Sequence, residues 1–283
     1  MIPKKPPISI AEAQLVTSGN QVIESADISP DGQWIVFDSN RSGNQDIYKM
    51  PLKGGEPEQL TSDPSDDFFP VWSPDGREIA FFSWRRGNRD IFLMTADGRT
   101  VKQLTDDPAH DFYPDWSPNS LELVFYSWRT GQDELFVVSR KDKNSEWEKE
   151  KQLTSDGGHD PKWSPDGRFI AYIKENALKM VPAGGGKPII LVQSSDLSGL
   201  PVPISCSWSL DGQSIYYKAR DPYGCESFWS LPVGGGKPQL LVRFDEYCGR
   251  SRRKEFSTDG RQFFLTLSSL QSDLWVADLL TDK

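Results

Sequence analysis

The sequence predicts an all-β fold, a six-bladed β-propeller with four antiparallel strands in each blade. The first observation is a turn motif, Ser-Pro-Asp-Gly or a degenerate copy of it, that recurs at intervals of 44 to 48 residues and begins at Ser29, Ser73, Ser117, Ser164, Ser209 and Ser257. The second observation is that each copy precedes the same order of apolar segments and polar turns. A repeat of this length with room for four strands is typical of a propeller blade.

One repeat shows how each element is assigned. Residues 73–76 read Ser-Pro-Asp-Gly, with Pro at the second and Gly at the fourth position, which favours a type I turn. Residues 79–82 form a short apolar run rich in aromatic residues, which predicts a buried strand. Residues 86–88 (Arg-Gly-Asn) form the next turn, and a third strand begins at Asp90. A Gly-containing turn and a Gln-Leu-Thr strand complete the blade.

The two ends of the sequence predict how the ring closes. Residues 14–17 resemble the last strand of a blade, as found at residues 59–61, 103–105 and 152–154. The final repeat supplies three strands, so we expect the N-terminal strand to complete it, which leaves only short, protected sheet edges. We therefore expect one propeller domain over residues 10–283, and residues 1–9 are predicted to be a Pro-rich linker from a longer precursor.

Composition limits the classes of partner. The net charge of −9 and the pI of about 4.9 disfavour sequence-independent binding of nucleic acid, which needs basic surface. No run of about 18 apolar residues is present, so direct membrane insertion is not expected. The lysines near the N-terminus are not followed by an apolar signal-peptide segment. No cofactor is expected, and we expect a monomer.

The repeat resembles the TolB-type propeller. The residues that carry the resemblance in the second blade are Trp-Ser-Pro-Asp-Gly at 72–76, Ile-Ala-Phe at 79–81, Asp-Ile-Phe at 90–92 and Gln-Leu-Thr at 103–105. The resemblance covers about residues 10–280 and implies a six-bladed fold that binds rather than catalyses. TolB itself is a periplasmic partner of a peptidoglycan-associated lipoprotein, and similar propellers form sensor-like modules of bacterial winged-helix regulators and Ser/Thr kinases.

These observations predict a non-catalytic scaffold that binds a protein or peptide segment. A periplasmic or other extracytoplasmic location is expected from the resemblance, and a cytoplasmic one stays open. One alternative is a sensory module at the C-terminal end of a bacterial regulator or Ser/Thr kinase. Another alternative is a propeller lyase or hydrolase that holds a metal through histidine.

The predicted binding surface is the channel mouth on one face of the ring. In a four-stranded meander the turns alternate between faces, so the middle turns and the connections between blades share one face. Aromatic and arginine residues clustered there match the composition of protein-binding hot spots. The candidate residues are Asp67, Phe68, Phe69, Trp84, Asp111, Phe112, Tyr113, Trp128, His159, Asp160, Arg250, Arg252 and Arg253. The alternative is that the aromatic side chains fill gaps between blades.

Two charged patterns favour structural roles. Three arginines precede an acid by five residues, which predicts the ion pairs Arg41–Asp46, Arg85–Asp90 and Arg129–Glu134. Residues 140–151 are dense in Lys and Glu and predict a solvated extension of a hairpin in the third blade.

Few residues in the sequence indicate catalysis or metal binding. His110 and His159, with Asp111 and Asp160 nearby, are the candidates for a metal site, and the favoured alternative is that both are solvated loop histidines. No Gly-x-Ser-x-Gly nucleophile motif is present.

Two cysteines are expected on the face of the channel mouth. Cys225 lies in the middle turn of the fifth blade and Cys248 in the connection that follows it, so they form either a disulfide or two independent thiols. A disulfide would indicate an oxidising compartment.

Overall fold

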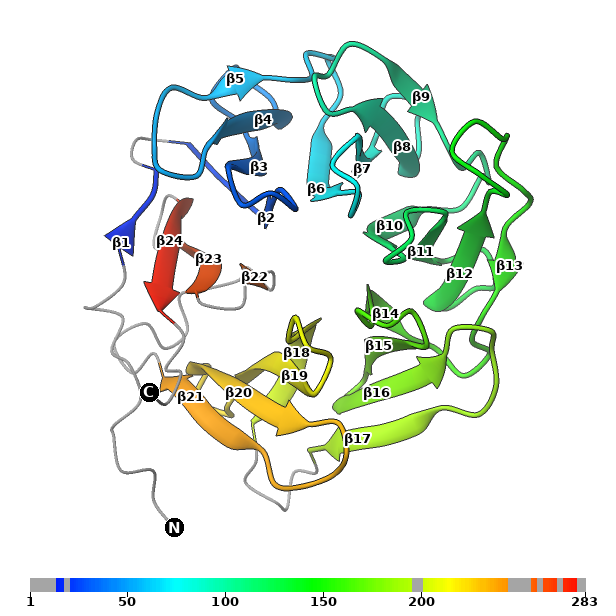
Figure 1. Ribbon diagram of the computed structural model, residues 1–283, viewed down its shortest axis with the longest axis vertical. Helices are drawn as coiled ribbons and strands as arrows, with labels where there is room; N and C mark the ends of the chain where they lie inside the picture. Colours follow the sequence, from blue (N-terminus) through cyan, green and yellow to red (C-terminus); the bar gives the residue numbers. More distant parts are fainter. Residues whose placement is uncertain are drawn as a thin grey trace.

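The chain folds into a ring of radially arranged four-stranded sheets around a central channel (Figure 1). The computed structural model describes residues 14–17, 21–194, 201–243, 256–258, 262–268 and 272–278. In this part of the chain all elements of regular secondary structure are β-strands, and they form six four-stranded sheets. The predicted all-β propeller is confirmed. No helix in the described segments has the length and apolar character needed to cross a membrane.

The first three blades are continuous stretches of chain, and each begins at the channel. The first contains β2 (Ala26–Ile28), β3 (Trp34–Ser39), β4 (Asp46–Pro51) and β5 (Glu58–Gln59). The second contains β6 (Asp67–Trp72), β7 (Glu78–Ser83), β8 (Asp90–Thr95) and β9 (Val101–Gln103). The third contains β10 (Asp111–Trp116), β11 (Glu122–Ser127), β12 (Glu134–Ser139) and β13 (Lys151–Gln152).

The next two blades repeat this order. The fourth contains β14 (His159–Trp163), β15 (Phe169–Lys174), β16 (Ala177–Pro182) and β17 (Ile189–Gln193). The fifth contains β18 (Val202–Trp208), β19 (Ser214–Arg220), β20 (Glu226–Pro232) and β21 (Gln239–Arg243).

The last sheet joins the two ends of the chain. It contains β22 (Phe256–Thr258), β23 (Gln262–Ser268) and β24 (Ser272–Asp278), and its outer strand is β1 (Gln14–Leu15). Gln14 pairs with Val276 and Leu15 with Trp275, antiparallel, which is the closure expected from the sequence. In Figure 1, β1 lies beside β24.

The repeated turn is stabilised by its own side chains. In the first copy, Asp31 Oδ1 accepts hydrogen bonds from Ser29 Oγ at 2.5 Å and from the Gln33 backbone N–H at 3.0 Å. These bonds lower the pKa of Asp31. Gly32 has φ of 66°, a conformation that glycine adopts without steric cost. The same pair of hydrogen bonds recurs at Asp75, Asp166 and Asp211, so these carboxylates stabilise the repeated turns.

The core lies between neighbouring blades, because each sheet buries its two faces against the next sheets. Between the first two blades, Val36 and Ile47 pack with Trp72, Ile79 and other apolar side chains. Polar contacts also cross the blade boundaries on the channel side. Asp27 Oδ2 accepts a hydrogen bond from the backbone N–H of Trp72 at 2.8 Å, and Asp115 Oδ2 accepts one from the backbone N–H of Trp163 at 2.7 Å.

The insertion of the third blade differs from the prediction. Arg140, its first residue, is buried between the second and third blades and pairs with Glu78. Trp147 forms an isolated bridge with Arg140 and packs on Trp116 with ring centroids 6.0 Å apart. The charged composition of residues 140–151 hides this pairing, and only the remainder of the segment is a solvated extension.

We predict that a chain lacking residues 1–17 is less stable, because it loses β1 and exposes the edge of β24. Val16, which packs against the cluster around Ile23 and Ile35, is lost as well. The expected decrease in melting temperature is about 5 °C or more. A chain lacking only residues 1–9 is the control. Equal melting temperatures and equal solubility of the two chains would contradict this role of β1.

Candidate functional site

A bulge in the innermost strand recurs in the second to fifth blades, and the first three of these bulges share a backbone feature. The strand register shifts between Phe68 and Val71, between Phe112 and Asp115, and between His159 and Lys162. At each of these three bulges one residue other than glycine has a positive φ: Phe69 (55°), Tyr113 (51°) and Asp160 (53°). Such a conformation costs on the order of 1–3 kcal/mol and is frequent at functional sites.

Asp38 holds the first of these bulges in place. Its Oδ1 accepts the backbone N–H groups of Glu24 at 2.6 Å and Ser25 at 3.3 Å, and its Oδ2 accepts that of Phe69 at 3.1 Å. Asp38 is fully buried, and burial raises its pKa to about 7 despite these bonds. The bulge of the second blade is thus fixed by a carboxyl group of the first blade.

An aromatic cavity lies at the channel mouth beside these bulges. Its volume is about 170 Å³, and its apolar walls come from the second and third blades: Phe68, Phe69, Phe82, Phe112, Tyr113 and Tyr126. Ring centroids of Phe69 and Tyr113 are 4.2 Å apart, and those of Phe112 and Tyr126 are 4.9 Å apart. The predicted aromatic residues of the channel mouth therefore come together, and they also fill the boundary between the two blades.

Two charged residues that were not predicted, Glu24 and Arg89, also line this cavity. Arg89 lies against two aromatic rings. Its guanidinium carbon lies 4.5 Å from the ring centroid of Trp84 and 4.7 Å from that of Phe112. Its Nε is buried without a hydrogen-bond acceptor, and within the described residues it forms no ion pair. Partial burial lowers its pKa, and the charge of Glu24 opposes this effect. A half-buried guanidinium of this kind can form charge-assisted hydrogen bonds with an anionic group.

Two tryptophans flank His110 at the rim. His110 Nδ1 accepts the Arg89 backbone N–H at 3.1 Å, and its ring lies edge-on to Trp84 and Trp128, at centroid distances of 5.3 and 6.2 Å. Trp128 is 52% exposed, the largest exposed fraction among the aromatic residues around the cavity. The predicted Trp84 and Trp128 thus lie together at the mouth, with Trp128 open to solvent.

Asp67 and Asp111 serve as internal anchors. Both are fully buried, and each carboxylate accepts two hydrogen bonds from one arginine, Arg85 at 2.8 and 2.7 Å and Arg129 at 3.1 and 2.9 Å. Because both carboxylates are paired inside a blade, they contribute to the predicted surface indirectly, by holding the turns that contain Arg85 and Arg129.

The predicted ion pairs five residues apart are therefore wrong. Asp90 accepts instead from the Gln103 side chain at 2.9 Å, since the outer strand lies next to it, while Arg85 reaches back to the inner strand. Glu134 accepts from Thr154 in the same way. Arg41 stacks on Tyr48, with 4.8 Å between the guanidinium carbon and the ring centroid, and bonds Ser39 Oγ.

The two histidines are not brought together as a metal site. His159 Nδ1 lies 3.3 Å from Asp160 Oδ2, and its ring packs edge-on to Tyr126, whereas His110 is bonded to the neighbouring backbone. Among the described residues, no three His, Cys, Asp or Glu side chains gather in a way that would hold a metal ion.

The remaining predicted residues are placed in part. Arg250, Arg252 and Arg253 lie outside the described residues. Cys225 is disulfide-bonded. Its predicted partner, Cys248, lies outside the described residues. Cys206 is free and buried.

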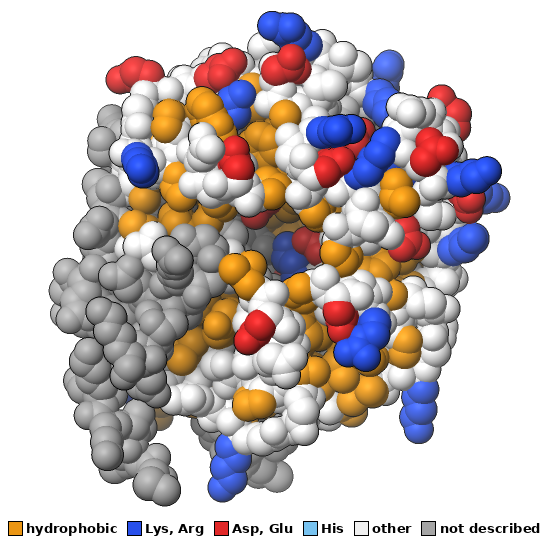
Figure 2. Space-filling model, viewed as in Figure 1, with side chains coloured by type: hydrophobic (Ala, Val, Ile, Leu, Met, Phe, Trp, Pro, Cys, Tyr) orange, Lys and Arg blue, Asp and Glu red, His pale blue; other side chains and the backbone are white. Residues whose placement is uncertain are grey.

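The channel itself carries charges of both signs. Lys162 Nζ lies 3.5 Å from Asp115 Oδ1, and burial raises the pKa of Asp27 to about 6, with the Trp72 hydrogen bond and Lys162 opposing it. Figure 2 shows a hollow at the centre of the ring with acidic and basic side chains inside it and hydrophobic side chains around it.

Comparison with known proteins supports the same fold. A family model described as the TolB beta propeller domain matches residues 61–198. An uncharacterized protein of Agrobacterium fabrum is 36% identical over 55 residues, which are 19% of this chain and 19% of that protein. The match thus spans about a fifth of the length of this curated relative.

Several solved structures share the architecture. A putative TolB from Agrobacterium tumefaciens has a TM-score of 0.68 at 20% identity, covering 81% of this chain and 84% of that one. TolB from Acinetobacter baumannii has a TM-score of 0.62 at 24% identity, covering 80% and 59%. An oligogalacturonate lyase in complex with manganese has a TM-score of 0.62 at 13% identity, covering 94% and 93%. At these identities the likeness concerns the fold.

We predict that Asp38 makes stability depend on pH. Its pKa in the folded state lies above its ordinary value of 3.8, so its stabilising contribution is complete below about pH 4 and is lost as pH rises through about 7. Asp38→Asn should therefore flatten the pH dependence of the free energy of unfolding in this window, by up to about 1.4 kcal/mol per pH unit. Denaturant titrations from pH 4 to 8 measure this slope, and parallel curves for both proteins would contradict it.

We predict that Asp67→Ala lowers the free energy of unfolding by about 3–5 kcal/mol, because Arg85 is left without its buried partner. Asp67→Ala combined with Arg85→Met should cost less than the sum of the two single changes. The matched control is Asp156→Ala, which breaks the more exposed pair with Lys179 and should cost less than about 1 kcal/mol. Similar losses for Asp67→Ala and Asp156→Ala would show that the buried pair has no special role.

Proposed function

We propose that this chain, a TolB-like β-propeller, is a non-catalytic scaffold that binds a protein or peptide segment at the channel mouth. The observation that carries the proposal is the aromatic cavity with Arg89 at its edge, a charged group without an ion pair in the described structure. A binding scaffold needs such a pre-formed recess, since little ordering of side chains then opposes association.

The chemistry of the cavity supports a segment with an apolar side chain beside a carboxylate. Six aromatic rings supply the apolar walls, and the cavity of about 170 Å³ admits a side chain rather than a whole domain. Arg89 would receive the carboxylate of the ligand, because guanidinium and carboxylate form strong charge-assisted hydrogen bonds. Trp128 extends the surface beyond the recess and would cover the bound segment.

An extracytoplasmic location is part of the proposal. The disulfide at Cys225 supports it, because structural disulfides persist in oxidising compartments. The likeness of the fold to TolB structures supports it as well. The alternative of a sensory module depends on segments beyond this chain and stays a prediction.

A lyase acting on acidic sugars is the second candidate function. It is favoured by the likeness to the oligogalacturonate lyase, which covers 94% of this chain, and by Arg89, which could receive a sugar carboxylate. Manganese titration followed by calorimetry, together with an absorbance assay for unsaturated sugar product, tests it. Manganese binding that is lost in His159→Ala, with product formation, would replace the scaffold proposal.

We predict that two single variants weaken capture of a protein partner from a cell-envelope extract. Arg89→Gln removes the positive charge and Trp128→Ala removes the exposed ring, and each should lower affinity for the captured partner by about thirtyfold. The control is Leu210→Ala, an exposed apolar residue in a repeated turn on the opposite face. Affinities are measured by calorimetry with the purified partner, after equal melting temperatures are confirmed. Equal binding by parent and Arg89→Gln would contradict the proposed site.

A further inference from the structure

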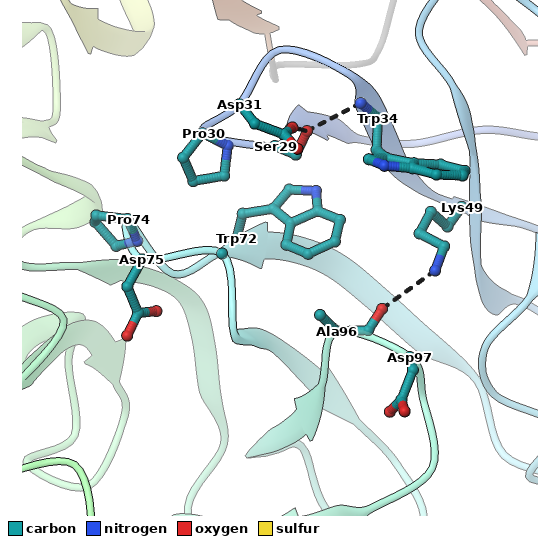
Figure 3. A pocket seen from close by; sticks show the side chains of 11 residues that line it. Ser29, Pro30, Asp31, Trp34, Lys49, Trp72, Pro74, Asp75, Ala96 and Asp97 are labelled. Atoms are coloured by element: carbon teal, nitrogen blue, oxygen red, sulfur yellow. Dashed lines mark hydrogen bonds between the residues drawn. The ribbon is translucent and has the colours of Figure 1, made fainter.

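A second recess lies between the first and second blades, on the face that carries the repeated Ser-Pro-Asp-Gly turns (Figure 3). Its volume is about 630 Å³, and the indole rings of Trp34 and Trp72 line it together with Pro30 and Pro74. Figure 3 shows the carboxylates of Asp31, Asp75 and Asp97 around these rings. It is separate from the channel mouth, because the turns of a meander alternate between the two faces.

The equivalent groove between the second and third blades is filled by the chain itself. Arg140 reaches into it from the insertion, and its guanidinium carbon lies 4.6 Å from the ring centroid of Trp147 and 5.7 Å from that of Trp116. The guanidinium pairs with Glu78 and donates to the Ser120 carbonyl at 2.9 Å.

A second cation of the insertion pairs with the turn carboxylate of that groove. Lys143 Nζ lies 2.8 Å from Asp75 Oδ2 and donates to the Ser120 carbonyl oxygen at 3.0 Å. The filled groove thus contains two cationic side chains and one indole, all from residues 140–147, against an aromatic floor and the carboxylates of Glu78 and Asp75.

The repeat allows a position-by-position comparison of the two grooves. Ala96 occupies the position of Arg140, because each donates its backbone N–H at 2.9 Å to the carbonyl of the residue directly before the blade's second strand, Arg77 and Leu121 respectively. Trp72 takes the place of Trp116, and Asp31 that of Asp75. The first groove therefore keeps the aromatic floor and the turn carboxylate but lacks the guanidinium that fills the second.

Two further differences change the walls and the charge of the first groove. Trp34 replaces Glu78 and adds a second aromatic wall, and a short turn beginning at Ala96 replaces the long insertion. Lys49 is the one cation in the lining, and its charge is already engaged: its Nζ lies 3.3 Å from Glu58 Oε2 and 5.1 Å from the ring centroid of Trp34. The Asp31 carboxylate is exposed at the rim and forms no ion pair within the described part of the chain.

We propose that the groove between the first two blades binds a basic peptide segment of a partner through an arginine side chain with an aromatic residue close to it. The arginine would lie on the rings of Trp34 and Trp72, as Arg140 lies near Trp116 in the next groove. It would pair with Asp31, whose counterpart Asp75 pairs with Lys143 of the insertion. Cation–π contacts and a charge-assisted hydrogen bond together provide the selectivity for arginine. This site is independent of the channel mouth and does not rest on the function proposed above.

The probe that tests the proposal is a fluorescently labelled peptide of residues 139–148, cyclised to keep the pairing of Arg140 with Trp147. Its binding to the full chain is measured by anisotropy, with a matched peptide in which the position of Arg140 is Gln and that of Trp147 is Ala. We expect binding of the first peptide at least about tenfold tighter than the second, and weakening by salt. Absence of binding, or equal binding of both peptides, would overturn the proposal.

Variants of the chain locate the site. Trp34→Ala and Asp31→Asn should each weaken binding by about tenfold, and Asn keeps the acceptor that Ser29 and Gln33 use in the turn. The double variant Trp34→Glu with Ala96→Arg recreates the pair of Glu78 and Arg140, so it should abolish binding while the melting temperature is retained. Unchanged binding by this filled but folded variant would overturn the proposal, whereas Arg89→Gln should leave binding unchanged.

Discussion

The contact between neighbouring blades is the interaction on which the rest of the structure depends. A single four-stranded sheet of this chain exposes two apolar faces and cannot bury them alone, so stability arises at the boundaries, where side chains such as Val36, Ile79 and Phe81 are completely buried. On the channel side, carboxylates of the innermost strand accept backbone N–H groups of the following blade, as Asp27 does from Trp72. Any recess that persists at a boundary is therefore surrounded by packed, well-fixed side chains, which suits a binding site.

The channel mouth develops from a departure within this regular scheme. The innermost strands of three blades each carry a bulge with a residue of positive φ, and a buried carboxyl group, Asp38, fixes one of them through three backbone hydrogen bonds. The second and third blades have Phe82 and Tyr126 at the repeat position of Asp38, and these rings line the aromatic cavity instead. The same position thus supports the site in one blade and forms its walls in the next two.

The features that repeat along the chain could be predicted from the sequence, whereas contacts with a neighbouring strand or blade could not. The turns, the strands and the closure by β1 follow from periodicity, because each is specified locally or by a missing partner. The aromatic residues of the mouth were predicted from their recurrence before each inner strand. Arg85 and Arg129 were assigned the wrong acids, since spacing along the chain does not tell which strand a long side chain crosses. Arg89 was missed because one charge in a polar turn has no distinctive pattern. Only comparison with Gln45 and Asp133, its counterparts in the adjacent repeats, could have singled it out.

Repeat proteins offer an internal reference that single-copy folds lack. The two grooves have the same backbone arrangement, an aromatic floor and a turn carboxylate. The presence of a side chain that fills only one of them can therefore be traced to a few residues. Between the second and third blades, Arg140 and Trp147 fill the groove. Between the first and second blades, Ala96 and a short turn leave the aromatic floor open, and Trp34 adds a second aromatic wall. The filled groove thus displays, in the chain's own residues, the chemistry that the open groove lacks. A basic segment would meet the same aromatic floor and turn carboxylate in the open groove, with the ring of Trp34 in place of the Glu78 carboxylate.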